Sequence, residues 1–100
     1  MSSPKYRLVL SPRAEQDIEG ILRYTGETWG ERQLIVYRDK IGDALDRLLR
    51  NPGSGHPSAD LPDAYRLYPV GLHVIVYRLK QQVIEVIRIL HQRMSLMRHV

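Results

Sequence analysis

The chain has 100 residues, of which 43% are hydrophobic and 26% charged, and it contains no cysteine. This size fits one domain over residues 1–100 that folds around its own core, and the lack of cysteine excludes disulfides, thiol catalysis and cysteine-ligated metals. Fifteen basic and eleven acidic residues give a net charge of +4, which suits an anionic partner but is equally an ordinary solubilising surface.

The first half of the chain predicts a strand followed by two helices. Residues 6–10 alternate in polarity and are rich in β-formers, which is typical of a short strand. The segment Ser11–Trp29 begins with an N-cap serine and a proline, and its apolar residues follow a helical spacing. Gly30 ends this helix, and a second apolar stripe over residues 31–50 continues until Asn51-Pro52-Gly53 stops it. The short connection between the two helices predicts a helical hairpin.

The second half predicts a loop and three strands. Residues 51–64 are rich in proline, glycine and serine and lack any period, as expected of a long loop. Strands are predicted at residues 65–68, 72–80 and 83–90, and the last two are β-branched on both faces, which favours central positions in a sheet. The tail from residue 91 onward is polar and basic.

The order β-α-α-β-β-β predicts an α+β fold in which the helical hairpin packs on one face of a small antiparallel sheet. The other face of the sheet is expected to stay open, so that a partner can dock on it. The interface between helices and sheet is expected to consist of apolar residues from all these elements, namely Ile18, Leu22, Trp29, Leu45, Leu48, Ile75, Val86 and Ile87.

Most chemistry-bearing motifs are missing from the sequence. There is no glycine-rich phosphate loop, and the four histidines are scattered, so neither a cofactor nor a metal site is expected. The acidic residues of the second helix are spaced for the surface pairs Asp43–Arg47 and Asp46–Arg50 rather than for acid–base catalysis. No apolar run is long enough to span a membrane or direct export, so a cytoplasmic protein without a membrane partner is expected.

One constellation of basic and aromatic residues remains in the strand half. On a sheet, such residues can cleave RNA, with histidine or tyrosine as acid or base and arginine stabilising the phosphorane. They can equally bind RNA by stacking and phosphate contacts, or simply fill the polar positions of alternating strands. The residues concerned are Arg66, Tyr68, His73, Tyr77, Arg78, Arg88, His91 and Arg93.

Several short stretches, spread over nearly the whole chain, are each weak signals but specific as a set. They are Tyr6–Leu8, Ser11–Ile18, Tyr24–Gly30, Asn51-Pro52, Arg66–Gly71, His73–Arg78 and the closing run Ile84–Met94. In their order and spacing they resemble the ParE branch of the RelE/ParE superfamily, which comprises toxins of type II toxin–antitoxin systems.

This resemblance implies a RelE-like fold and a toxin that a ParD-like antitoxin neutralises by direct binding. The toxin and antitoxin are expected to form a hetero-oligomeric complex that binds operator DNA through the antitoxin, with no sequence-specific nucleic acid binding by the toxin itself. ParE-type toxins inhibit DNA gyrase and arrest growth, so the resemblance implies a DNA gyrase inhibitor that acts by protein binding and is not an enzyme.

The RelE branch shares the fold but cuts mRNA in the ribosome, and its nuclease residues are mostly missing here. Val74 stands where nuclease relatives place a catalytic arginine, Gln92 stands where some carry tyrosine, and residues 51–64 contain no lysine or arginine. His91 alone matches an acid–base position, which is too little for an efficient ribonuclease. A ribosome-dependent mRNA endoribonuclease therefore stays the alternative, beside an inactive toxin that survives as a ParD-binding repressor partner.

The residues expected to carry toxicity lie at the end of the last strand. This run follows Leu90, the last apolar residue of that strand, so packing does not demand its polar sequence. The alternative is structural: the histidine closes the strand edge and the methionine covers the end of the sheet. The target-binding candidates are His91, Gln92, Arg93 and Met94, with Arg88 in support.

Overall fold

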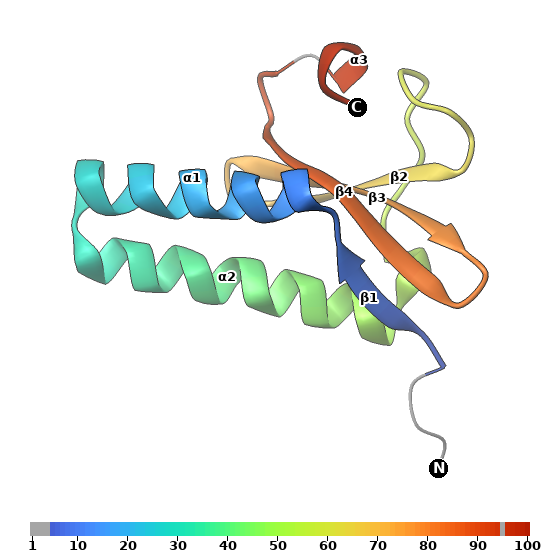
Figure 1. The fold of residues 1–100 in the computed structure, drawn as a ribbon, viewed down its shortest axis with the longest axis horizontal. Coiled ribbons are helices and arrows are strands. Elements are labelled where there is room, and N and C mark those ends of the chain that lie inside the picture. Colours follow the sequence, from blue (N-terminus) through green and yellow to red (C-terminus); the bar gives the residue numbers. More distant parts are fainter. Residues whose placement is uncertain (1–4, 95) are drawn as a thin grey trace.

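The computed structural model describes residues 5–94 and 96–100, and its two long helices and four strands follow the predicted order (Figure 1). A short 3-10 turn and a C-terminal helical turn, neither of them predicted, complete it. The elements are β1 (Arg7–Leu10), α1 (Pro12–Trp29), α2 (Glu31–Arg50), η1 (Pro52–Ser54), β2 (Tyr65–Val70), β3 (His73–Lys80), β4 (Val83–His91) and α3 (Leu96–His99).

The start and end of α1 lie where the sequence predicts them. The Ser11 hydroxyl accepts a hydrogen bond from the Ala14 N–H at 3.0 Å, which satisfies one of the free donors of the first turn. Gly30 has a φ of +97°, a conformation that other residues rarely adopt, and its N–H binds the Gly26 carbonyl. This single residue reverses the chain, so α1 and α2 lie side by side (Figure 1).

Within the described residues, no helix combines the length and the apolar character that crossing a membrane requires.

The sheet has the order β1-β4-β3-β2 and is mixed rather than wholly antiparallel. The two hairpins pair antiparallel as predicted, but β1 runs parallel to β4, with Arg7 opposite Val83 and Leu10 opposite Val86. A tight hairpin forces antiparallel pairing, whereas a strand that returns through a long crossover is free to pair in parallel. Here α1, α2, β2 and β3 lie between β1 and its partner β4 in the sequence.

The free edge of β2 is closed to further strands over much of its length. Leu67 exchanges two backbone hydrogen bonds with His56 of the preceding loop, at 2.8 and 3.0 Å. Two residues further on, Pro69 has no N–H to offer. Short edges blocked by loops and proline discourage edge-to-edge pairing.

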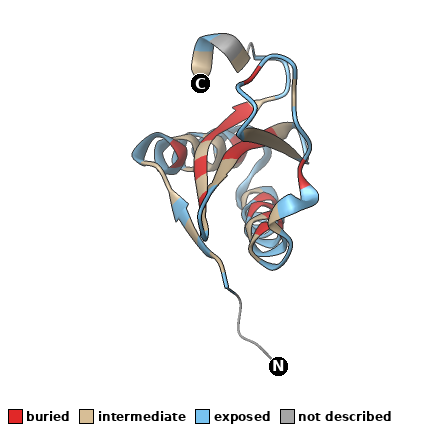
Figure 2. Cartoon of the chain, turned by 90° about the vertical axis from the view of Figure 1, so that its right-hand side faces the viewer, coloured by how far each residue is buried: buried red, intermediate tan, exposed pale blue. Residues whose placement is uncertain are grey.

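The core between the helical hairpin and the sheet confirms most of the predicted interface. Leu48, Ile75 and Val86 are buried, and Ile18, Leu22 and Leu45 pack partly buried against them. Buried residues gather on the central strands and on the inner side of the helices (Figure 2).

Two residues of the predicted interface lie elsewhere. Trp29 is 70% exposed, because the tip of the helical hairpin projects beyond the sheet (Figure 1). Ile87 is only partly buried and does not join the helix-facing core. The register between β3 and β4 shifts there, so that Tyr77 pairs with Val86 and Val76 with Arg88, and Ile87 is left as a bulge.

The second face of the sheet is covered, so the expectation of an open face is wrong. Leu61 of the long loop, Val74, Val76 and Leu90 form a smaller buried cluster, and Leu96 of α3 packs against it. In Figure 1 the loop and α3 lie on the opposite side of the sheet from α2. The sequence shows no long periodic segment here, because one loop leucine and a single helical turn provide the cover.

Candidate target-binding site

Residues 91–94, named here the C-terminal turn, begin at the last residue of β4. The Met94 N–H binds the His91 carbonyl at 2.9 Å, and the Arg93 N–H donates to the His91 Nδ1 at 3.2 Å. His91 therefore holds the turn together with both its backbone and its ring. Met94 is 40% exposed, and Arg93 is exposed with no carboxylate partner among the described residues.

Gln92 anchors the C-terminal turn to the turn between β2 and β3. Its N–H binds the Leu72 carbonyl at 3.0 Å, and its side-chain amide donates to the Gly71 carbonyl at 3.1 Å. The polar residue at this position thus has a structural task, while its neighbours Arg93 and Met94 project from a fixed platform. The structure brings all four predicted residues of the turn together at one end of the sheet.

A series of three rings joins this turn to α2. The ring of His91 meets the edge of His73 at 5.3 Å between centroids, and His73 meets Tyr37 at 5.5 Å. The Tyr37 hydroxyl lies 2.6 Å from the His73 Nδ1 and accepts the Leu72 N–H at 3.0 Å. Tyr37 was predicted only as part of the apolar stripe of α2; its hydroxyl is the contact that sequence periodicity does not reveal.

The environment of His73 favours its neutral form. Burial is the main cause that lowers the pKa of His73, the nearby charge of His91 lowers it further, and Asp17 opposes these effects. Burial likewise raises the pKa of Tyr37, despite backbone hydrogen bonds from residues 72 and 73 that act in the other direction. Both groups are therefore uncharged at neutral pH.

We expect the domain to lose stability when the pH falls below about 6.5, the ordinary pKa of histidine. The pKa of native His73 is lower, so the unfolded chain binds a proton first, and the free energy of unfolding falls until the native pKa is reached. Urea denaturation from pH 5 to 8, for the wild type and His73→Gln, checks this. The wild type should lose more stability toward pH 5 than the variant; parallel profiles would contradict the prediction.

Arg88 lies inside the fold, between α1 and α3. Its guanidinium donates two hydrogen bonds to the Asp17 carboxylate, at 2.8 and 3.0 Å, and the side chains are only 11% and 15% exposed. These bonds raise the pKa of Arg88, which stays charged. A third bond, from Nη1 to the His99 carbonyl at 2.8 Å, ties α3 to the sheet. Arg88 thus holds α3 near α1 and β4, and its side chain is not exposed to a target.

Asp17 was not singled out by sequence reasoning, yet it joins α1 to β4. Beyond binding Arg88, its carboxylate accepts the N–H of Ile89 at 2.9 Å. Ser11, six residues earlier at the N-cap, also contacts β4, because its hydroxyl donates to the Ile87 carbonyl at 2.7 Å. The start of α1 therefore provides hydrogen-bond partners for the backbone groups of β4 that lie beyond the end of β1.

The basic and aromatic residues of the other strands do not assemble into one site. Arg66 donates to the Gly55 carbonyl, the buried Tyr77 hydroxyl accepts the Gly55 N–H, and Arg78 forms an ion pair with Glu85. Each of these side chains is engaged within the fold. Among the described residues, no three side chains of histidine, aspartate or glutamate are placed to hold a metal ion.

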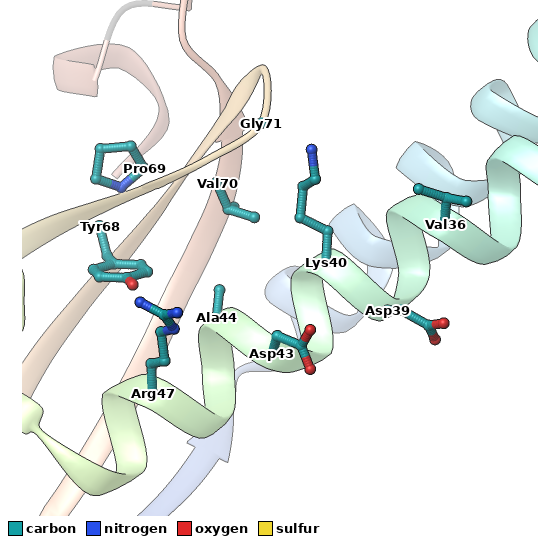
Figure 3. Close-up of a pocket in the computed structure, with 10 residues that line it drawn as sticks. All are labelled: Val36, Asp39, Lys40, Asp43, Ala44, Arg47, Tyr68, Pro69, Val70 and Gly71. Atoms are coloured by element: carbon teal, nitrogen blue, oxygen red, sulfur yellow. The ribbon is translucent and has the colours of Figure 1, made fainter.

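The surface ion pairs predicted for α2 are absent from the described residues. Neither Asp43–Arg47 nor Asp46–Arg50 forms; the one ion pair on the surface of this helix joins Arg38 to Asp39. In Figure 3 the Arg47 side chain points toward Tyr68 on β2, away from Asp43. The spacing of Asp43 and Arg47 allows the pair on an isolated helix, but here the Arg47 side chain extends toward β2 instead.

A comparison with solved structures identifies the class of fold. The chain superposes with a TM-score of 0.77 on a chain of the chromosomal ParDE TA system from P. aeruginosa, at 22% sequence identity, covering 89% of this chain and 98% of that one. The molecule thus has the fold of a toxin–antitoxin system component.

Sequence comparisons then establish the family. Residues 8–96 match the family model of the ParE toxin of type II toxin–antitoxin system, parDE. Toxin ParE1 of Caulobacter vibrioides is 35% identical over 91 residues, or 91% of this chain and 94% of the relative. Toxin ParE1 of Mycobacterium tuberculosis is 35% identical over 95 residues, or 94% and 97%. The chain belongs to the ParE family of type II toxins.

Proposed function

We propose that this toxin arrests growth by binding DNA gyrase and that it catalyses no reaction. The observation that carries the proposal is the contrast between the C-terminal turn, where Arg93 and Met94 are exposed, and the strand arginines Arg66, Arg78 and Arg88, which bind groups within the fold. Val74, which stands at the position of a nuclease arginine, is 8% exposed and lies under Leu61 and Leu90.

The proposed regulator is a ParD-like antitoxin that binds the toxin directly. The family described by the matching model belongs to parDE systems, and the structurally similar chain comes from a ParDE TA system. The pair forms a hetero-oligomeric complex, and the antitoxin carries this complex to operator DNA. Expression in the cytoplasm gives the toxin access to gyrase.

A gyrase assay beside a translation assay tests the proposed activity. Purified toxin is expected to cause gyrase-mediated DNA cleavage and to leave mRNA intact in a ribosome-dependent translation reaction. Cleavage of mRNA without any effect on gyrase would instead make the protein a RelE-type endoribonuclease. A folded toxin inactive in both assays would be a repressor partner alone.

We expect Arg93→Ala to abolish growth arrest while the protein stays folded. The side chain is exposed and makes no ion pair among the described residues, so its removal alters the free energy of unfolding by less than ~0.5 kcal/mol. Induced expression in a bacterial host measures toxicity, and thermal unfolding measures stability. Arg23→Ala, an exposed arginine on α1, is the matched control and should remain toxic.

His91→Ala is expected to reduce toxicity as well, because the His91 ring accepts the Arg93 N–H and fixes the turn. If Arg93→Ala and His91→Ala both remain fully toxic, or lose toxicity only by unfolding, the C-terminal turn is not the target-binding site. The surface of the helical hairpin would then be the next candidate.

A further inference from the structure

Acidic and basic residues are distributed differently over the helices and the sheet. Eight of the eleven acidic residues lie in α1 and α2, two lie in the loop over residues 51–64, and Glu85 alone lies in a strand. The four strands carry five lysine and arginine residues. The helices therefore mix both signs of charge, as a solubilising surface does, whereas the sheet is predominantly basic.

Part of this basic charge lies on the sheet face that points away from the helices. The core on the helix side contains one residue from each of the three strands near the β3–β4 turn, namely Leu8, Leu79 and Ile84. Because successive side chains of a strand point to opposite faces, their neighbours Arg7, Lys80 and Val83 project from the other face. The loop and α3 cover that face around Val74 and Leu90, toward its far end, so that Arg7 and Lys80 are exposed.

Arg7, Val83 and Lys80 form one row across the sheet. Arg7 pairs with Val83 of β4, and Val83 pairs with Lys80 of β3. Neighbouring strands lie about 4.8 Å apart, so the two basic residues are about 10 Å apart with an aliphatic side chain between them. Among the described residues, neither has a carboxylate within ion-pair distance, and Glu85 on the same face is paired with Arg78. The positive charge of this row is therefore not neutralised within the fold.

A polar hollow of about 610 Å³ adjoins this row. Its lining includes Lys5, Arg7 and the two glutamines of the β3–β4 turn, and it contains no carboxylate. Lys5 likewise has no ion-pair partner in the part of the chain that the structure describes. The set named here the basic turn surface comprises Lys5, Arg7, Lys80, Gln81 and Gln82, all of them exposed. In Figure 1 the start of β1 and the β3–β4 turn lie at the end of the sheet opposite the C-terminal turn.

We propose that the basic turn surface binds the phosphate backbone of duplex DNA without reading its sequence. Lysine, arginine and amide side chains are typical phosphate ligands, and such contacts position a duplex but carry no sequence information. Long side chains that start about 10 Å apart can reach phosphates on both sides of the minor groove, which is about 6 Å wide. Because the surface lies at the end of the sheet away from the C-terminal turn, this contact is separate from the proposed binding of gyrase.

Two other ligands fit this surface less well. Unpaired bases need exposed aromatic rings on which to stack, but Tyr6 packs against the core, and the Tyr65 ring lies 5.7 Å from the Arg78 guanidinium. An acidic protein segment needs apolar anchors, and the hollow offers only Tyr6 and Val83, both partly buried. The backbone of a duplex asks only for the charges and amides that the surface presents.

Titration of fluorescent duplexes with the full-length toxin tests this inference. Two duplexes of unrelated sequence are expected to bind equally well, with a Kd of about 10⁻⁴–10⁻⁶ M at physiological salt. Contacts from Lys5, Arg7 and Lys80 to three phosphates give the logarithm of the association constant a slope of about −2.7 against the logarithm of the salt concentration. Arg7→Gln and Lys80→Gln should each reduce the steepness of this slope by about 1, and the double variant should raise the Kd about tenfold at low salt.

The matched control is Arg23→Gln, which removes the same charge from an exposed position on α1 and should change the Kd less than about twofold. All variants should unfold at the wild-type temperature, because the replaced side chains are exposed and form no ion pair among the described residues. If the wild type fails to bind either duplex, or the double variant binds as tightly as the wild type, the inference is wrong. It is also wrong if a single strand binds more tightly than the duplex, or if poly-glutamate binds as tightly, because the ligand would then be unpaired bases or an acidic protein.

Discussion

Replacing Asp17 by alanine is expected to lower the free energy of unfolding by about 3–5 kcal/mol, because removal of one partner strands a buried charge. Arg88 would keep its guanidinium in a site where it is 11% exposed, with its two strongest hydrogen bonds gone. The Ile89 N–H would lose its acceptor at the same time. Urea denaturation followed by circular dichroism measures the loss.

Two further variants distinguish the loss of the Asp17–Arg88 pair from the loss of any negative charge on α1. Glu19→Ala removes an exposed carboxylate from the same helix and is expected to change stability by less than ~0.5 kcal/mol. The double variant Asp17→Leu, Arg88→Met should recover much of the loss, since apolar residues of similar volume often replace a buried pair without penalty. An Asp17→Ala protein as stable as Glu19→Ala would show that the pair contributes nothing.

Leu48→Ala is expected to cost about 2–5 kcal/mol, the usual range for truncating a leucine in a packed core. Leu48 is fully buried on the inner side of α2, where it belongs to the core shared with the strands. The matched comparison is Trp29→Ala, a larger truncation on the same hairpin. Because Trp29 is 70% exposed, that change should leave the thermal midpoint nearly unaltered. Equal losses in the two variants would contradict the arrangement of the hairpin.

The elements that sequence reasoning predicted well are those with local signals. The Ser11 cap and the reversal at Gly30 each act within a few residues, so the bounds of α1 follow from neighbours in the chain. Helical spacing also predicted the buried stripe of α2. The same spacing misplaced Trp29, because periodicity tells which side of a helix is apolar but not how far the sheet beneath it extends.

The parts that were missed depend on contacts between distant segments. Asp17 and Arg88 are 71 residues apart, and nothing in the spacing around either residue reveals the pair. The Tyr37 hydroxyl reaches His73 across 36 residues in the same way. The run from His91 to Met94 stays a candidate that the sequence singles out, because it follows the last apolar residue of β4, whereas the ring contacts that join it to α2 appear only in the folded chain.

The parallel pairing of β1 with β4 has a consequence for the order of folding. Ser11 and Ile87, where this pairing ends, are 76 residues apart. Closing so long a loop lowers the entropy of the chain before the contacts that stabilise the pairing have formed. The hairpins of β2, β3 and β4 need no such closure. On the ribosome, β1 has no strand to join until residues 83–86 emerge. We therefore expect the first strand to be synthesised to be the last to enter the sheet, and the β4 edge that α1 covers to be completed in the same step.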